Sequence, residues 1–194
     1  MNRDDTLLEE RELKLCEALL KLDQRNFHCW NHWMLICKRM NLSLENQLAF
    51  TWSRITENAS NYSAWHFRGQ LLKELLLSKY RDDPTKCIDY LTSELEVNLN
   101  ALYTECDDQS SWYYMRTLIY IARELQQEKI IDRLAVDELI HTRMNELNEL
   151  IDFAPDCLYG AQFLEELKSL CSVCLYSPVR IHFEKIFRGY GLWI

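Results

Sequence analysis

Apolar side chains recur along most of the chain at the three- and four-residue spacing of amphipathic helices. In residues 5–22 one face carries Leu8, Leu15, Ala18, Leu19 and Leu22. Two later segments repeat this pattern, with Leu44, Leu48, Trp52 and Ile55 in one stripe and Ile140, Met144, Leu147 and Ile151 in the other. Asp83 before Pro84 and Ser177 before Pro178 each predict a helix N-cap followed by proline in the first turn. The pattern therefore predicts consecutive amphipathic helices.

A short motif repeats along these predicted helices. "RNFHCW" and "SNYSAW" both read Asn, an aromatic residue, two further residues and Trp, and they place Trp30 and Trp65 in equivalent positions. "DDQSSW" places Trp112 in the same way, and a weaker fourth copy has Tyr159 at the Trp position. Such spacings are typical of stacked helical hairpins, in which neighbouring hairpins cover each other's apolar faces. We therefore predict one all-α domain over residues 1–194, built from stacked helical hairpins.

Composition supports the helical prediction and excludes several classes of protein. With 4 Gly and 3 Pro in 194 residues, the chain lacks the residues that the tight turns of a β-rich fold require. A net charge of −8 without a cluster of Lys and Arg argues against binding to nucleic acid. No apolar run reaches the ~20 residues of a membrane span, and the acidic beginning of the chain is unlike a signal peptide. The 8 cysteines of such a chain are expected to stay reduced, which predicts a cytoplasmic location.

The repeated motif resembles the repeat of protein prenyltransferase α-subunits. The wording of "LDQRNFHCW", "LAFTWSRITENASNYSAWHFR", "DDQSSWYYMR" and "SPVRIHFEKI" is most similar to the α-subunits of Rab geranylgeranyltransferases. The resemblance extends roughly from Leu13 to Tyr190 and implies a crescent-shaped α-α superhelix. A generic tetratricopeptide array, whose close helix crossings need more Gly and Ala, fits less well.

The resemblance also implies partners and cofactors. An α-subunit of this family wraps a β-subunit, which is expected to hold the catalytic zinc and most of the isoprenoid pocket. Geranylgeranyl diphosphate is the expected co-substrate of the heterodimer. The expected acceptor is a Rab GTPase, which its escort protein presents. We expect no metal or cofactor on this chain itself. A non-catalytic helical-repeat adaptor and a tetratricopeptide-type peptide binder remain the alternatives.

The family motif indicates which residues approach the diphosphate. Those residues are Arg25, Asn26, Phe27 and His28. Family members have further repeats upstream, including one with a lysine near the diphosphate, so the chain reads as an N-terminally short version with an exposed apolar face at that end. Phe27 lacks the hydroxyl of the tyrosine that farnesyltransferases carry there, and Trp33 stands where a family arginine is expected.

The motif copies also predict an interface with the β-subunit. Its predicted members are Trp30, His32, Asn61, Tyr62, Trp65, His66, Arg68, Trp112, Tyr113 and Arg116. For the three tryptophans, packing inside the chain is the alternative, because a buried indole needs a partner for its N–H. For Arg68 and Arg116 the alternative is an ion pair within the chain.

Other polar clusters predict no chemistry. Cys171 and Cys174 form a single CxxC, and Cys157 and His182 lack the spacing of a zinc site. The paired acids Glu165–Glu166 and Asp107–Asp108 read as solvated helix faces and turn caps. No phosphate-binding glycine loop or nucleophile elbow is present in the sequence.

Overall fold

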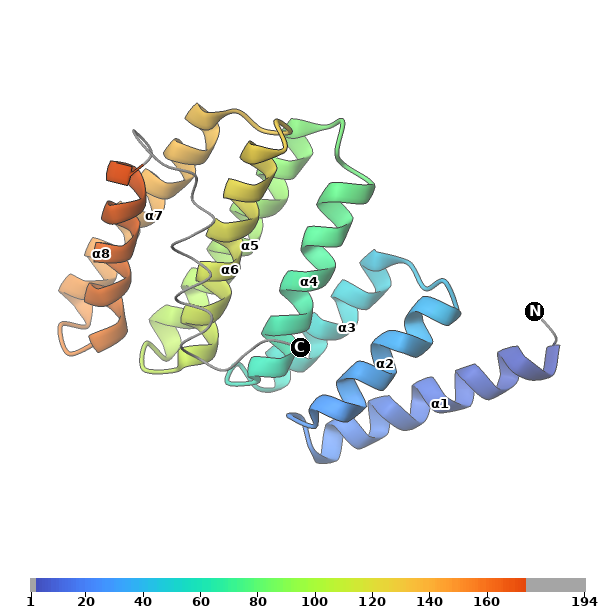
Figure 1. Cartoon of the computed structure of the whole chain (residues 1–194). Coiled ribbons are helices and arrows are strands. Elements are labelled where there is room, and N and C mark those ends of the chain that lie inside the picture. The colour runs from blue at the N-terminus through green and yellow to red at the C-terminus, as the bar shows by residue number, and fades with distance from the viewer. Residues whose placement is uncertain (1–2, 174–194) are drawn as a thin grey trace. The chain divides into compact units, whose positions relative to one another are not determined.

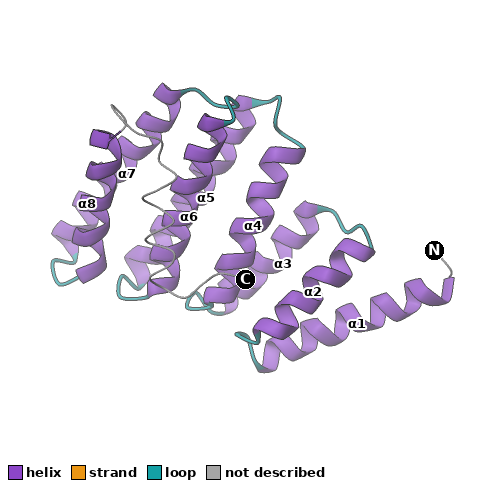
Figure 2. Cartoon of the chain, in the orientation of Figure 1, coloured by secondary structure: helices purple, strands orange, loops and turns teal. Residues whose placement is uncertain are grey.

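The computed structural model describes residues 3–173, and its described side chains are those of residues 7–170. All regular elements in this part of the chain are helices, as Figures 1 and 2 show. They are α1 (Arg3–Leu22), α2 (Phe27–Arg39), α3 (Leu44–Glu57), α4 (Tyr62–Ser78), α5 (Pro84–Thr104), α6 (Gln109–Gln127), α7 (Arg133–Phe153) and α8 (Leu158–Val173). The prediction of an all-α fold is confirmed.

The chain divides into two compact units, Met1–Val136 and Asp137–Ile194. The boundary falls in the first turn of α7, so the first unit holds α1 to α6 and the second holds most of α7 together with α8. A single domain over 1–194 stays a prediction.

The first unit consists of helical hairpins. Helix α1 packs on α2, α3 on α4, and α5 on α6, while α4 and α6 also contact each other (Figure 1). We call the first helix of each hairpin the A helix (α1, α3, α5) and the second the B helix (α2, α4, α6). The stacking of helical hairpins that the repeats predict is thus present in this unit.

Side-chain caps fix where several helices begin. The Ser43 hydroxyl accepts a hydrogen bond from the backbone N–H of Asn46 at the start of α3. Asp83 accepts from the N–H of Lys86 at the start of α5, with Pro84 in the first turn. The predicted cap at Asp83 is therefore confirmed, whereas the one at Ser177 and Pro178 lies outside the described residues.

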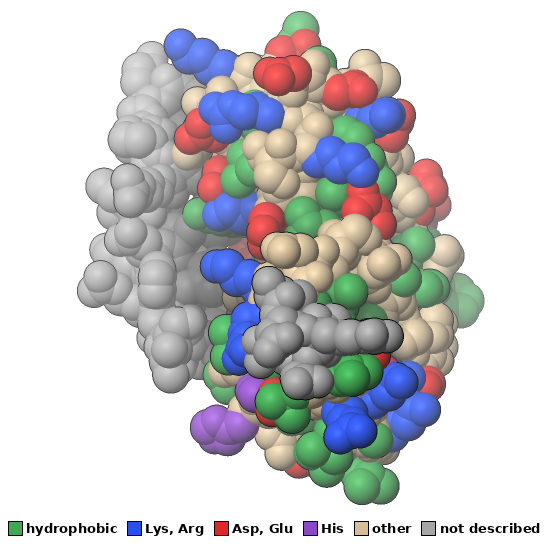
Figure 3. Space-filling model, turned by 90° about the vertical axis from the view of Figure 1, so that its right-hand side faces the viewer, with side chains coloured by type: hydrophobic (Ala, Val, Ile, Leu, Met, Phe, Trp, Pro, Cys, Tyr) green, Lys and Arg blue, Asp and Glu red, His purple; other side chains and the backbone are tan. Residues whose placement is uncertain are grey.

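The apolar stripe of α1 is not the face that this helix buries. The buried apolar residues of α1 are Cys16 and Leu20, whereas the leucines of the stripe are exposed by 45–85%: Leu8, Leu15, Leu19 and Leu22. Figure 3 views the molecule from the side where α1 and α2 lie in Figure 1, and green hydrophobic side chains gather at its lower edge. The exposed apolar face expected near this end of the chain is thus present on α1.

Gly69 allows α4 and α6 to approach closely. A Cβ atom at this position would lie 2.7 Å from Cγ2 of Thr117 on α6. Gly69→Ala is therefore expected to lower the free energy of unfolding, because overpacking costs about 1–3 kcal/mol and helix propensity returns at most ~1 kcal/mol. Urea unfolding would measure the change.

The methyl group of Thr117 provides the matched control. Thr117→Ser removes Cγ2, so the double variant Gly69→Ala/Thr117→Ser should recover most of the lost stability. If Gly69→Ala were as stable as the wild type, the result would contradict the close packing of α4 on α6 at this position.

Candidate protein interface

The A and B helices are joined by four-residue turns of one type. In each turn the backbone N–H of the fourth residue donates to the carbonyl oxygen of the first, from Asn26 to Asp23, Asn61 to Asn58, Asp108 to Glu105 and, in the second unit, Cys157 to Ala154. In the first three turns the fourth residue also caps the following helix, because Asn26, Asn61 and Asp108 accept a backbone N–H from its first turn. The first Asn of the sequence motif is therefore a helix cap.

The tryptophan of each motif closes the same turn from inside. Its indole N–H donates to the carbonyl oxygen six residues earlier, Trp30 to Gln24 at 2.9 Å, Trp65 to Ala59 at 2.7 Å and Trp112 to Cys106 at 2.6 Å. All three tryptophans are fully buried, and so is Asn61. The structure thus gives the three tryptophans the packing role that the sequence allowed as the alternative, and it buries Asn61, for which only an interface role was predicted. The predicted contact with a partner would therefore involve the exposed residues around these buried side chains.

The buried indoles also join neighbouring hairpins. Trp30 of α2 stacks on Phe67 of α4 with 5.2 Å between ring centroids, and it lies 5.7 Å from Phe50 of α3. Trp33 stacks on Phe50 at 4.5 Å. Trp33 is 2% exposed, so the position at which the resemblance implied an arginine holds an aromatic contact between hairpins.

The turn register corrects one part of the repeat assignment. Trp30, Trp65 and Trp112 each lie four residues after the last residue of their turn. In the fourth copy, Cys157 ends the turn, and the equivalent position is therefore Ala161 and not Tyr159. The spacing between the tryptophans did not predict this position, because the third and fourth turns lie farther apart in the sequence than that spacing suggests.

Arg68 is held by an ion pair within the chain. Its guanidinium donates to both carboxylate oxygens of Glu94 on α5, at 2.7 and 2.5 Å, and to the carbonyl oxygen of Leu48 on α3 at 2.8 Å. The Tyr114 hydroxyl of α6 donates to the same carboxylate at 2.6 Å. The side chains of Arg68 and Glu94 are only 11% and 9% exposed. The alternative of an internal ion pair is therefore the one that the structure shows for Arg68.

Burial and the neighbouring charges shift the pKa values of Arg68 and Tyr114. Burial alone would lower the pKa of Arg68, but the hydrogen bond and charge of Glu94 outweigh it and the pKa is raised. Burial and the neighbouring carboxylate hold the pKa of Tyr114 well above its ordinary value. The residue of α6 that is equivalent to Arg68 is Met115, which is buried. Arg116 is the next residue along α6 and is half-buried.

The residues predicted to approach a diphosphate lie in the first turn and the start of α2. Arg25 is exposed, and its guanidinium donates to the carbonyl oxygen of Ser60 in the second turn at 3.1 Å. Asn26 is occupied as the cap, while Phe27 and His28 are exposed. Arg25 and His28 thus remain accessible to a ligand, and their role stays a prediction.

Half-buried aromatic side chains continue this surface onto α4 and α6. The Tyr62 and Tyr113 rings lie 4.6 Å apart, and the His66 Nδ1 atom lies 3.0 Å from the Tyr113 hydroxyl. Phe27 and His66 both contact the ring of Phe67 between them. We call Phe27, Tyr62, His66 and Tyr113 the aromatic patch. It combines the exposed Phe27, predicted to lie near the diphosphate, with three half-buried members of the predicted interface, and its residues lie on three successive B helices.

Burial lowers the pKa of His66 in this patch. A histidine whose pKa is lower in the folded than in the unfolded chain binds fewer protons when folded, so acid destabilises the fold. The free energy of unfolding should fall as pH drops below the ordinary histidine pKa of about 6.5 towards the lowered value.

The variant His66→Gln should remove that part of the pH dependence. Urea unfolding at several pH values between about 5 and 7 would measure it, a window that covers the ordinary histidine pKa. If the free energy of unfolding of His66→Gln changed with pH as steeply as that of the wild type, His66 would not be the group responsible. His28→Gln, which alters an exposed histidine, serves as the control.

His32 lies on another side of α2, towards α1. Its Nε2 atom is 3.1 Å from a carboxylate oxygen of Glu12, and both side chains are partly exposed. His32 is therefore separate from the aromatic patch.

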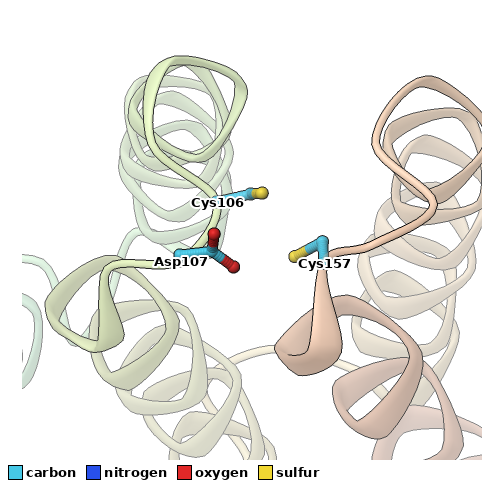
Figure 4. A group of neighbouring side chains, drawn as sticks. All are labelled: Cys106, Asp107 and Cys157. Carbon is cyan, nitrogen blue, oxygen red and sulfur yellow. The ribbon is translucent and has the colours of Figure 1, made fainter.

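Turn residues include three that offer metal-binding atoms. Cys106 and Asp107 belong to the turn between α5 and α6 in the first unit, and Cys157 ends the turn before α8 in the second (Figure 4). The carbonyl oxygen of Cys106 accepts the Trp112 indole N–H, which gives this residue a structural role. Of the CxxC pair, the side chain of Cys171 is not described, and Cys174 and His182 lie outside the described residues.

The model of the protein prenyltransferase α-subunit repeat matches residues 9–40 and 44–75. These two ranges coincide with the hairpins α1–α2 and α3–α4. Residues 9–75 thus contain two repeats of the protein prenyltransferase α-subunit type. The same turn recurs before α6 and α8, so this local structure continues beyond the matched ranges.

Three curated relatives with the name geranylgeranyl transferase type-2 subunit alpha show the extent of the similarity. The protein from Sus scrofa is 42% identical over 110 residues, which are 56% of this chain and 19% of the pig protein. The protein from Dictyostelium discoideum is 37% identical over 148 residues, covering 76% of this chain and 44% of the relative. The protein from Saccharomyces cerevisiae is 28% identical over 133 residues, covering 64% and 40%. The chain thus spans less than half the length of these relatives.

No helix in the described part of the chain is long and apolar enough to cross a membrane.

Proposed function

We propose that the chain acts as the α-subunit of a protein geranylgeranyltransferase that modifies Rab GTPases. The observation that carries the proposal is the 42% identity over 110 residues to a geranylgeranyl transferase type-2 subunit alpha, which accompanies the match of residues 9–40 and 44–75 to the prenyltransferase α-subunit repeat. In this role the chain would operate in the cytoplasm and would scaffold a β-subunit that binds zinc. The escort protein would present the Rab GTPase to the heterodimer.

The aromatic patch is the part of the surface that suits a β-subunit. Aromatic side chains supply much of the energy of protein interfaces, and the residues of the patch lie on three successive B helices. Hydrogen bonds from Arg25 and Ser110 to the carbonyl oxygen of Ser60 tie the neighbouring turns together. A surface whose parts are fixed before binding loses less conformational freedom on association.

The chemistry would take place on the partner. A Rab cysteine thiolate would attack C1 of geranylgeranyl diphosphate, forming the thioether while diphosphate departs. From this chain, the exposed guanidinium of Arg25 could donate forked hydrogen bonds to the diphosphate, and His28 could donate one more. Phe27 can donate none, so its contribution would be apolar contact.

Co-expression with a type-2 β-subunit, followed by a lipid-transfer assay, tests the proposal. Geranylgeranylation of a Rab GTPase in the presence of its escort protein is the expected result. A complex that forms but transfers no lipid would favour the alternative of a non-catalytic adaptor. The side chain of Phe27, which has no hydroxyl, is consistent with that alternative. A β-subunit that never copurifies would contradict the α-subunit proposal and leave the adaptor as the alternative.

A further inference from the structure

The first hairpin buries a pair of free cysteines where α1 packs on α2. Cys16 of α1 is 4% exposed and Cys29 of α2 is 8% exposed, and neither belongs to a disulfide. The Cys29 thiol donates a hydrogen bond to the backbone carbonyl oxygen of Cys16, with 3.5 Å between the sulfur and oxygen atoms. The two residues therefore touch across the contact of two helices, although they are 13 positions apart in the sequence.

The surroundings of the two thiols favour ionisation of Cys29 over that of Cys16. Burial, followed by the charge and the hydrogen bond of Cys29, raises the pKa of Cys16 to about 11. Burial also raises the pKa of Cys29, but the hydrogen bond with the Cys16 thiol acts in the opposite direction. Cys29 moreover lies in the first turn of α2, where the positive end of the helix dipole favours a thiolate. Cys29 is therefore the thiol of the pair that reacts first.

We propose that Cys16 and Cys29 are an oxidation site, at which a low-molecular-weight disulfide such as glutathione disulfide converts the two thiols into an intramolecular disulfide. The Cys29 thiolate attacks one sulfur of glutathione disulfide, which forms a mixed disulfide and releases the first glutathione. The Cys16 thiol then loses its proton, and its sulfur attacks the Cys29 sulfur and displaces the second glutathione. The cysteines give up two electrons and two protons, and both glutathiones leave as thiols. The proposal does not depend on the function proposed above.

The disulfide fixes the start of α2 to α1. It closes a short loop that contains the first turn together with the exposed Phe27 and His28, so the oxidation state restrains this part of the surface. A cross-link of this kind removes conformations from the unfolded chain, while the folded chain already holds the two cysteines in contact. Oxidation should therefore lower the unfolding equilibrium constant by about a hundredfold, as is typical for a loop of this length.

Oxidation of the purified, folded chain tests the proposal. The chain is incubated with glutathione disulfide in the absence of denaturant, for long enough that local openings expose the buried thiols. It is then unfolded, its remaining thiols are alkylated, and it is digested with trypsin, which places Cys16 in peptide 15–21 and Cys29 in peptide 26–38. The expected product is these two peptides joined by a disulfide. Urea unfolding of the oxidised and the reduced chain then measures the change in the equilibrium constant.

Cys37 provides the matched control, because it is a third buried cysteine of the same hairpin and also lies in peptide 26–38. Cys37→Ala should keep both the joined peptides and the change in stability, whereas Cys29→Ala should lose both. The proposal would be overturned if the two peptides stayed separate after oxidation, if they remained joined in Cys29→Ala, or if a mixed disulfide with glutathione were the final product. An oxidised chain that is less stable than the reduced one would also overturn it.

Discussion

Arg68→Ala is expected to lower the free energy of unfolding by about 3–5 kcal/mol, because it leaves a buried carboxylate without its positive partner. Arg68 joins three helices, donating to Glu94 on α5 and to the Leu48 carbonyl oxygen on α3 from its own position on α4. Removal of the guanidinium would strand the Glu94 charge and break the contact between the second and third hairpins. Urea unfolding followed by circular dichroism measures the loss.

Two controls separate this effect from the loss of any charged pair. Arg81→Ala breaks the pair with Glu128, in which both side chains are half exposed, and should cost under about 1 kcal/mol. Glu94→Gln in the background of Arg68→Ala removes the stranded charge and should restore part of the stability. If Arg68→Ala cost no more than Arg81→Ala, the network would not stabilise the fold as described.

Trp65→Ala is the second substitution with a large expected effect, about 3–5 kcal/mol. The fully buried indole packs on Tyr114 with 4.6 Å between ring centroids, and its N–H closes the turn on Ala59. The substitution would remove both the contact between hairpins and the hydrogen bond. Thermal unfolding of the purified chain would report it as a lower midpoint.

Trp33 offers a matched comparison for the hydrogen bond. It is also buried, but its indole N–H has no acceptor among the described residues. Trp65→Phe should therefore cost more than Trp33→Phe, by about the 0.5–1.5 kcal/mol of one hydrogen bond, because Ala59 is exposed and water can hydrate its carbonyl oxygen in the variant. Equal costs for the two variants would show that the bond to Ala59 adds no stability.

Local signals in the sequence predicted much of this fold. The caps, the periodic apolar faces and the repeated Asn-aromatic-x-x-Trp motif each act within one helix and its preceding turn, so the residues that decide them are close in sequence. Asp83 before Pro84 is one such case, in which the cap and the proline together define where α5 begins. The demand of a buried indole for a partner likewise left packing as an open alternative at Trp30, Trp65 and Trp112.

Contacts between hairpins could not be read in the same way. Glu94 is 26 residues away from Arg68 in sequence, and its burial depends on how α4, α5 and α6 pack. The stripe on α1 had the periodicity of a buried face, but what covers such a face depends on the neighbouring hairpin and not on the helix itself. Ala161 was missed for a different reason, because the fourth copy lacks the Asn and Trp of the motif and its register was taken from the tryptophan spacing and not from its turn.

Association with a type-2 β-subunit is the most direct test of the central claim, that the repeats serve as an α-subunit scaffold. Size-exclusion chromatography with light scattering would measure the mass of the mixed proteins. We predict a single species with the mass of one copy of each chain, and a Phe27→Ala variant that forms less of it than the wild type. Two separate peaks, each with the mass of one protein alone, would contradict the account.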